Sequence, residues 1–380
     1  MSANVIRIAG AGDRGFDAYL AVAEAGSGPG VVLLHENAAD AMPIADLYAA
    51  EGYAVLCPEG LGTEDDVAAA IAALRGRNEC TGKLAALGFG RGGLPALRAA
   101  AERRVEGAVC YCAGGVDELF NLAPRLGCPT VLHFAENDPA VPSDTLARVK
   151  EAFAGRVEVG VHVYPGTRRG FEHKGGANYN RAAAGLAHSR SIALLRRVIG
   201  PHYDLETLWE AHTRYEFVTR DVDATMATMV AEPYVNHVPV MTGGVGQRDL
   251  ARFYADHFIP KCPADIAMVP VSRTIGADRV VDEMVVSFTH DVEIDWMLPG
   301  VPPTGRRVEV PLVAIVGFRG DKLFHEHIYW DQASVLVQIG LLDPKTLPVA
   351  GSETARKLLD ETRPSNTLMK RRPASAPRSG

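Results

Sequence analysis

Apolar and polar positions alternate in a regular way over the first 200 residues. Short continuous apolar runs, typical of buried strands, occur at 30–34, 53–57, 84–87, 105–112, 130–134 and 157–164. Longer stretches with helical composition lie between them, at 41–51, 65–75, 94–101 and 143–153. This alternation predicts a parallel sheet with helices on both faces and functional residues at the carboxyl ends of its strands.

The pattern changes after Ile199-Gly200-Pro201, where a Gly-Pro pair ends the last helix. Asp204 is placed to cap a new helix. Further helices are expected at 224–230 and 248–258, a glycine-rich turn at 243–246, and strands at 234–240, 266–274, 279–289, 306–318 and 322–331. Helices followed by a bent antiparallel sheet predict an α+β cone. We therefore expect one domain over 1–200 and a second over 203–345.

Composition and charge narrow the class of protein. The 380 residues suffice for two domains with separate cores, and the formal net charge of -7 argues against a nucleic-acid partner. The sequence shows neither a signal-peptide pattern nor an apolar run near 18 residues, so we expect a cytoplasmic protein without membrane contact. The six cysteines lack zinc-binding spacing. Residues 363–380 are rich in Pro, Ser and Arg and predict a disordered tail.

The glycine turn GFGRGG stands between a predicted strand and a predicted helix. It fits the nucleophile elbow Gly-x-Nuc-x-Gly, but the central residue is Gly90, which has no side chain that could attack a substrate. Gly88, Gly90 and Gly93 also match a dinucleotide fingerprint. The next strand ends in Tyr111 and Cys112 rather than in the carboxylate that this fingerprint needs, so we expect no cofactor.

The first 200 residues resemble a dienelactone hydrolase (carboxymethylenebutenolidase) domain. The matching pieces are LLHENAAD, AAEGYAVLCPEGL, GFGRGG, VCYCAGG, AENDPAVP and YPGTRRGF. The resemblance implies an α/β hydrolase-like doubly wound sheet and a Cys-His-Asp triad. Asp138 matches the family's Asp, whereas Gly90 stands at the Cys position and Arg169 at the His position. With this degenerate triad, we expect the family's nucleophilic chemistry to be absent.

A relocated nucleophile is an alternative. Cys112 lies near the carboxyl end of the neighbouring strand, and His173 lies four residues after Arg169. Glu36 lies in the loop where the family keeps a pocket carboxylate, which makes it a candidate for substrate binding. These residues support a second hypothesis, a lactone or ester hydrolase in which Cys112 and His173 replace the lost pair.

Residues 203–345 resemble the SnoaL-like branch of the NTF2-like superfamily. The matching segments are RDVDATMATMVAEPYVNHVPV, GGVGQRDLARFYADHF, PPTGRRVEVPLVAIVGFRGDK and HIYWDQASVLVQIGLL. The resemblance implies a cone-shaped α+β domain, found in cyclases, isomerases, epoxide hydrolases, dehydratases and non-catalytic binding modules. It also implies pairing into a homodimer. The acid/base Asp of the cyclases matches Asp331.

The last predicted strand, FHEHIYWD, carries an unusual number of polar residues. Strand alternation places His325, His327, Tyr329 and Asp331 on one face and Glu326, Ile328 and Trp330 on the other. We expect the polar row to line the pocket of the cone, because a core face does not tolerate so many polar groups without purpose. Asp331 would be the general acid or base, assisted by His325, His327 and Tyr329.

Other candidates complete this hypothesis. His237 would join the catalytic set, and Asp295 and Trp330 would contact the substrate. His325 and His327 could bind a divalent metal with His237 or Glu326, but only two ligands clearly converge, so we predict none. The leading hypothesis is a small-molecule enzyme using acid/base chemistry of the isomerase, cyclase, hydratase or lyase type. The alternatives are the relocated hydrolase and a non-catalytic ligand-binding protein.

Overall fold

The computed structural model describes residues 2–10 and 15–369, and the chain forms two compact units, Met1–Tyr203 and Asp204–Gly380. We call them the N-terminal unit and the C-terminal unit and describe each by itself. Of the predicted disordered tail, 363–369 contains no helix or strand, and 370–380 lies outside the described residues. No helix in the described part of the chain is both long and apolar enough to cross a membrane.

The N-terminal unit contains a sheet of eight strands in the order β1-β2-β4-β3-β5-β6-β7-β8. Their bounds are β1 (Ser2–Ala9), β2 (Gly15–Val22), β3 (Gly28–Leu34), β4 (Ala54–Pro58), β5 (Cys80–Phe89), β6 (Gly107–Tyr111), β7 (Thr130–Ala135) and β8 (Val159–Tyr164). Six neighbouring strands of this sheet are parallel, as predicted: β4, β3, β5, β6, β7 and β8. The sheet as a whole is mixed, because β1 and β2 add an antiparallel hairpin that the apolar pattern did not reveal. An edge strand is exposed on one side, and Val5 of β1 is 67% exposed, so this segment lacks a continuous apolar run.

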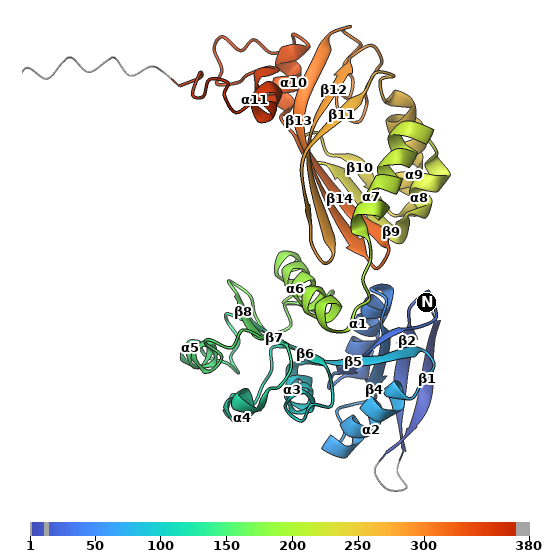
Figure 1. The fold of residues 1–380 in the computed structure, drawn as a ribbon, viewed down its shortest axis with the longest axis vertical. Coiled ribbons are helices and arrows are strands. Elements are labelled where there is room, and N and C mark those ends of the chain that lie inside the picture. Colours follow the sequence, from blue (N-terminus) through green and yellow to red (C-terminus); the bar gives the residue numbers. More distant parts are fainter. Residues whose placement is uncertain (1, 11–14, 370–380) are drawn as a thin grey trace, which may run out of the picture. The chain divides into compact units, whose positions relative to one another are not determined.

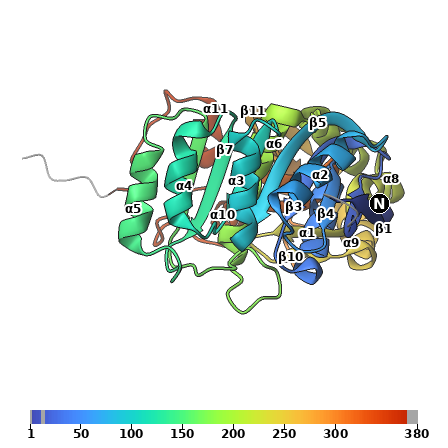
Figure 2. The ribbon, with the colours of Figure 1, turned by 90° about the horizontal axis from the view of Figure 1, so that it is seen from below.

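Helices cover both faces of this sheet (Figure 1). One face carries α1 (Ala38–Ala50) and α6 (Arg181–Ile199). The other carries α2 (Glu64–Arg75), α3 (Gly93–Ala101), α4 (Val116–Leu122) and α5 (Ser143–Ala152), which lie side by side in Figure 2. This arrangement is the predicted doubly wound α/β fold, and the loops at the strand carboxyl ends meet along one edge of the sheet.

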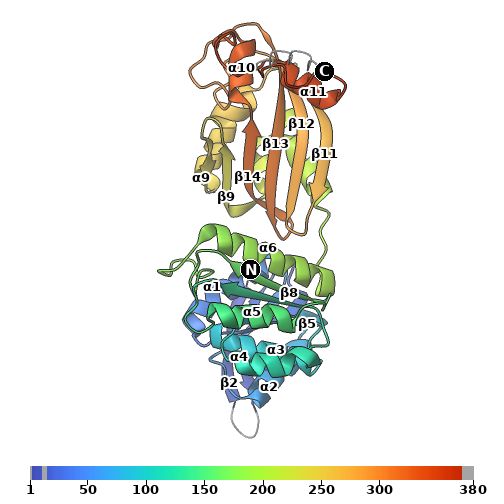
Figure 3. The same ribbon diagram turned by 90° about the vertical axis from the view of Figure 1, so that its left-hand side faces the viewer.

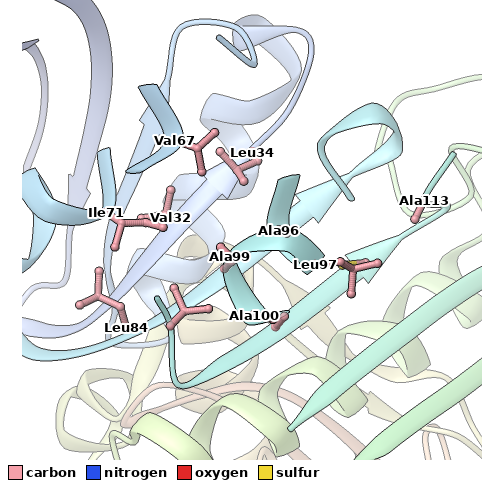
Figure 4. Close-up of a cluster of buried hydrophobic side chains, with 14 of the residues drawn as sticks. Val32, Leu34, Val67, Ile71, Leu84, Ala96, Leu97, Ala99, Ala100 and Ala113 are labelled. Carbon is pink, nitrogen blue, oxygen red and sulfur yellow. The ribbon is translucent and has the colours of Figure 1, made fainter. Parts of the chain in front are cut away.

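Buried apolar side chains beneath α2 and α3 pack these helices against the sheet (Figure 4). Val32 and Leu34 of β3 and Leu84 of β5 are at most 1% exposed and pack beside the two helices. The helix α3 presents mainly alanines to the sheet, at 96, 99 and 100, so it can approach the strands closely. Each fully buried Val or Leu stabilises the fold by about 1.5–3 kcal/mol, which keeps the start of α3 in a fixed position.

The C-terminal unit contains a sheet of six strands in the order β10-β9-β14-β13-β12-β11, shown face-on in Figure 3. Their bounds are β9 (Met229–His237), β10 (Thr242–Val245), β11 (Ala267–Ile275), β12 (Arg279–Thr289), β13 (Arg307–Arg319) and β14 (Lys322–Trp330). The pairing is antiparallel except between β9 and β14. The strand β10 replaces the predicted glycine-rich turn, and β9 begins five residues earlier than expected, at Met229.

One face of this sheet carries three helices, α7 (Leu205–Arg214), α8 (Val222–Ala227) and α9 (Gln247–Phe253). Asp204 caps α7 by accepting a hydrogen bond from the Thr207 amide at 3.0 Å, as predicted. Both α7 and α9 continue as π-helical segments, Tyr215–Thr219 and Tyr254–Phe258. Two further helices, α10 (Gln332–Gln338) and α11 (Glu353–Leu359), follow β14.

Candidate functional site

The turn after β5 keeps the backbone of a nucleophile elbow. Gly90 has a φ of 52°, in the left-handed region that such elbows require. A β-carbon at Gly90 would meet only Glu36 Oε1 at 3.6 Å and Arg169 Nη1 at 3.7 Å, which are ordinary contact distances. A side chain would therefore fit at this position. The elbow has lost its nucleophile but not the space that one would occupy.

The flanking glycines are needed for packing. A β-carbon on Gly88 would lie 2.3 Å from the carbonyl oxygen of Gly92, and one on Gly92 would lie 2.0 Å from the carbonyl oxygen of Leu34. These distances are far below van der Waals contact. The close approach of backbone segments thus explains the glycines without a bound dinucleotide.

Asp138 and Arg169 form an ion pair beside the elbow, in which the carboxylate is buried and the guanidinium is partly exposed. Arg169 Nε donates to Asp138 Oδ1 at 3.1 Å, and Nη2 lies 2.9 Å from Oδ2. The Asp138 side chain is fully buried and also accepts a hydrogen bond from the Ala140 amide. A guanidinium has no acceptor atom and stays charged, so Arg169 cannot act as a general base. Asp138 therefore positions a permanent positive charge where the family pattern would place an imidazole.

A cavity of about 250 Å³ opens at these strand ends. We call it the N-terminal cavity; its lining residues are His35, Glu36, Asp40, Phe89, Gly90, Cys112, Arg169, Gly170, Glu172, His173, Gly176, Ala177 and Asn178. It contains the predicted pocket residue Glu36 and two of the three triad positions. It also brings together Cys112 and His173, the predicted substitutes for the lost pair.

Cys112 directly follows β6 and has a φ of 48°. A positive φ is uncommon for a residue other than glycine and is a recurrent feature of active sites. Burial and the negative charge of Glu172 raise the pKa of the Cys112 thiol to about 12. The resting side chain is therefore a neutral thiol that needs a base during any reaction.

Glu172 and His173 are the nearby groups that could exchange a proton. Burial raises the pKa of Glu172, and its buried Oε2 has no hydrogen-bond partner among the described residues. His173 Nε2 lies 3.7 Å from Asp40 Oδ1. Burial also lowers the pKa of His35, which lines the same cavity. The N-terminal cavity thus combines a thiol, a carboxyl group that gains protons readily, and a fixed guanidinium.

A second, smaller cavity of about 50 Å³ lies between the sheet and helices of the C-terminal unit. We call it the C-terminal cavity. Its walls are mostly apolar, and its polar members are Thr213, Glu216, His237, Tyr254 and Glu326. Burial lowers the pKa of His237 to about 4, so this imidazole is neutral at neutral pH.

His212 lies behind the two glutamates. Its Nε2 is 3.2 Å from Glu216 Oε1 and 3.2 Å from Glu326 Oε1, and its Nδ1 is 2.6 Å from Thr228 Oγ1. Burial alone would lower the pKa of His212, but the charges of Glu216 and Glu326 raise it to about 10. Burial raises the pKa of Glu326. All three side chains are at most 5% exposed.

The predicted pocket face of β14 is wrong. The residues of β14 that line the C-terminal cavity are Glu326 and Ile328, whereas His325, His327 and Tyr329 lie on the opposite face, and Tyr329 is 41% exposed. Strand alternation separates the two faces correctly but does not say which one is inside. The neighbouring strand decides this, because Val316 and Ala314, which pair with Glu326 and Ile328, are fully buried.

Three other predicted site residues do not line the C-terminal cavity. Asp331 is exposed and caps α10 by accepting a hydrogen bond from the Ser334 amide at 3.2 Å. Asp295 lies 3.1 Å from His257 Nδ1. Trp330 is buried, with its ring 5.9 Å from that of His237, so it supports the cavity wall from behind. Of the predicted catalytic set, only His237 lines the C-terminal cavity.

Comparisons with known proteins agree with this division. A model of the dienelactone hydrolase family matches residues 61–199, and a model of the SnoaL-like domain matches 209–326. A protein of Azospirillum brasilense, provisionally named carboxymethylenebutenolidase, is 30% identical over 226 residues, which cover 50% of this chain and 97% of that protein. The chain belongs to the dienelactone hydrolase family.

The chain is also similar to other proteins and solved structures. The carboxymethylenebutenolidase of Pseudomonas putida is 28% identical over 130 residues, which cover 34% of this chain and 55% of that enzyme. Among solved structures, a dienelactone hydrolase-like promiscuous phosphotriesterase from metagenomic libraries has a TM-score of 0.46 and 21% identity, covering 52% of this chain and 99% of that one. An esterase domain of a Rhodothermus marinus protein has a TM-score of 0.42 and 18% identity, covering 52% of this chain and all of that domain.

Membership in the dienelactone hydrolase family bears on the residues Gly90 and Arg169. Gly90 and Arg169 both fall within the matched segment. The sequence resemblance implies that they stand at the family's nucleophile and base positions. The candidate site residues that sequence reasoning missed are His212, Glu216, Tyr254 and Glu172. A signal existed for the first two, since residues four apart on a helix share a face, but only the fold shows that Glu326 joins them.

Proposed function

We propose that the N-terminal cavity hydrolyses a small ester or lactone, with Cys112 as the nucleophile. The observation that carries the proposal is the position of Cys112: it has a positive φ at the end of the strand beside the empty elbow, and it lines the same cavity as Glu172 and His173. Similarity to proteins named carboxymethylenebutenolidase supports the hydrolase class.

The neutral thiol of Cys112 must lose its proton as it attacks. The Sγ–carbon bond forms while the proton moves to the carboxylate of Glu172, whose raised pKa suits it to accept one. The carbon–oxygen bond of the ester then breaks, and the departing alcohol oxygen takes the proton from Glu172. A water molecule attacks the resulting thioester with Glu172 as the base, which releases the acid and regenerates the thiol.

Negative charge develops on the carbonyl oxygen in both steps. Arg169 supplies a positive charge close to the elbow, and its two contacts with Asp138 fix the guanidinium before substrate arrives. A charge that is already oriented stabilises a transition state without a cost of reorganisation. In this proposal Arg169 gives one substituted triad position an electrostatic function, whereas Gly90 contributes no side chain.

Cavity size favours this site over the acid/base hypothesis for the SnoaL-like pocket. Sites for small molecules commonly have volumes of about 300–1,000 Å³. The N-terminal cavity, at about 250 Å³, approaches that range, whereas the C-terminal cavity, at about 50 Å³, is too small for a cyclic or polyketide-like substrate without movement of its walls. The isomerase or cyclase hypothesis therefore takes second place.

The test uses full-length protein and a panel of p-nitrophenyl esters and five- and six-membered lactones. We expect Cys112→Ala to lower kcat by about 10³-fold or more, because the residual rate then comes from binding and charge stabilisation alone. Cys110→Ala is the matched control, since Cys110 is a buried thiol of β6, two residues before Cys112, that lies outside the cavity lining. Intact-mass measurement during turnover should detect an acyl group on Cys112.

A different mechanism would give a different result. Glu36 Oε1 lies 3.6 Å from the β-carbon position of Gly90, so a water molecule activated by Glu36 is the main competitor. If Cys112→Ala remains active and Glu36→Gln is inactive, the nucleophile is water and not Cys112. If the unchanged protein hydrolyses none of the panel, the proposed activity is wrong.

A further inference from the structure

We propose that His212, Glu216 and Glu326 bind one divalent ion of a first-row transition metal in the C-terminal unit. This site is independent of the hydrolase proposed above. His212 lies on α7, Glu216 lies four residues later in its π-helical continuation, and Glu326 lies on β14, so two separate parts of the fold place the three ligand atoms. The three atoms lie within 4.8 Å of one another.

The distances suit a shared ion. Metal–nitrogen and metal–oxygen bonds of about 2.1 Å place neighbouring ligand atoms about 3.0–3.4 Å apart, depending on the coordination angle. His212 Nε2 lies 3.2 Å from an oxygen of each glutamate. At these distances neither Nε2 nor Glu326 Oε1 has a partner in the direction of a hydrogen bond, although both atoms are buried. An ion placed between these atoms would be within reach of both.

The other ring nitrogen of His212 fixes the tautomer. Thr228 Oγ1 lies 2.6 Å from the carbonyl oxygen of Thr225 and donates its only hydrogen there. The same hydroxyl oxygen, 2.6 Å from His212 Nδ1, must therefore accept a hydrogen from Nδ1. A neutral His212 consequently points the Nε2 lone pair at two carboxylates, and a hydrogen bond from Nδ1 of this kind is the usual support of a metal-bound histidine.

Charge balance favours a divalent cation. Glu216 and Glu326 are 4% and 3% exposed, and among the described residues their ion-pair partner is His212 alone. Buried carboxylates require compensation. A proton on His212 would neutralise only one of the two negative charges, whereas a divalent ion neutralises both.

The remaining coordination positions would face the C-terminal cavity. Glu216 and Glu326 line that cavity, and His212 lies behind them. Three protein ligands with an open side are typical of metal sites that bind an exchangeable ligand. The mostly apolar cavity of about 50 Å³ has room for water or another small oxygen donor. The mixed nitrogen and oxygen donors fit zinc, cobalt, manganese or iron better than calcium.

The experiment is a titration of untagged, chelator-treated full-length protein with Co²⁺ and Zn²⁺. We expect saturation at one ion per chain, with visible absorption bands of protein-bound Co²⁺. Glu326→Gln, which preserves side-chain shape, and His212→Gln should weaken binding at least about 100-fold, because each removes a direct ligand. His290→Gln is the matched control: His290 is also fully buried with Nδ1 beside a threonine hydroxyl, at 3.1 Å, but has no carboxylate at Nε2.

Several outcomes would overturn the site. These are the absence of saturable binding, full binding by Glu326→Gln, and binding that is lost only when His325 and His327 on the opposite face of β14 are both replaced. If His212→Gln does not fold, Glu326→Gln and anomalous scattering from Co²⁺-soaked crystals of the unchanged protein decide the question. An anomalous peak between the three residues supports the site, and a peak elsewhere, or none, refutes it.

Discussion

The two cavities of this chain are built in opposite ways. The N-terminal cavity keeps the backbone of a known catalytic turn and has lost the side chains that the turn normally carries, at Gly90 and Arg169. The C-terminal cavity has apolar walls that would suit any small protein core, yet it is also lined by the buried ionisable side chains of Glu216, His237, Tyr254 and Glu326. A catalytic turn can thus keep its backbone conformation after its reactive side chains have been replaced. A pocket can also contain ionisable side chains that belong to no recognisable sequence motif.

The largest expected effect comes from restoring the missing couple in the N-terminal cavity. We expect Gly90→Cys/Arg169→His, made in a Cys112→Ala background, to raise ester hydrolysis by about 10³-fold over that background, because a thiol and an imidazole then stand at the family positions. The open space at Gly90 makes this substitution feasible. The control is Gly90→Ala/Arg169→His, which lacks the thiol. Equal rates for both variants would show that the elbow has also lost its catalytic geometry.

Removing the partner of the two buried glutamates beside the C-terminal cavity should destabilise the protein. His212→Leu leaves Glu216 and Glu326 without their partner in a buried position, and breaking such a contact costs about 3–5 kcal/mol. Urea denaturation followed by the fluorescence of the three tryptophans, all in the C-terminal unit, measures the change. Replacing all three residues together by His212→Leu/Glu216→Gln/Glu326→Gln should restore part of the loss. A single variant as stable as the unchanged protein would contradict the charge argument.

The reactivity of Cys112 should depend steeply on pH. Because the pKa of this thiol is raised to about 12, the thiolate fraction, and with it the rate of alkylation by iodoacetamide, should increase about tenfold per pH unit from 7 to 10 without a plateau. Subtracting the labelling of Cys112→Ala isolates this residue. A plateau near pH 8 would mean that Cys112 is already activated in the free protein.

The smallest effect is expected at Asp331, the residue that the sequence singles out most strongly. Asp331→Ala should cost about 1 kcal/mol of stability, as expected for the loss of a helix cap, and should leave ester hydrolysis unchanged. Asp331→Asn, which can still cap the helix, serves as the control. A large loss of turnover in Asp331→Asn would instead revive the acid/base hypothesis for the SnoaL-like unit.

The sequence predicted the elements of the fold well where an apolar run or a cap carries the information. The strands β3 to β8 follow continuous apolar runs, and Asp204 caps α7 as expected. The hairpin β1–β2 was missed because an edge strand such as β1 needs no such run. These successes and failures have a common cause: local patterns report burial, and they report nothing about a surface that is only partly covered.

The candidate sites were predictable only in part. The degenerate triad follows from Gly90 and Arg169, and the grouping of Cys112 with His173 follows from strand order. The face of β14 that points into the cavity could not be predicted in this way. Strand alternation divides the side chains between two faces without saying which face is buried, and the burial of Val316 and Ala314 on the next strand decides this. The contact between His212 and Glu326 depends on how α7 crosses the sheet, which no local pattern records.

The π-helical segment Tyr215–Thr219 makes the position of Glu216 depend on chain length as well as on residue type. A π-helical turn accommodates one residue more than an α-helical turn, and each residue of a helix is rotated by about 100° from the last. Deleting one residue after Glu216 would allow an ordinary helix and would rotate the chain that follows by about 100° relative to His212 and Glu216, which keep their four-residue spacing. The two helical residues would then stay together, whereas Glu326 on the sheet would lose its position beside them.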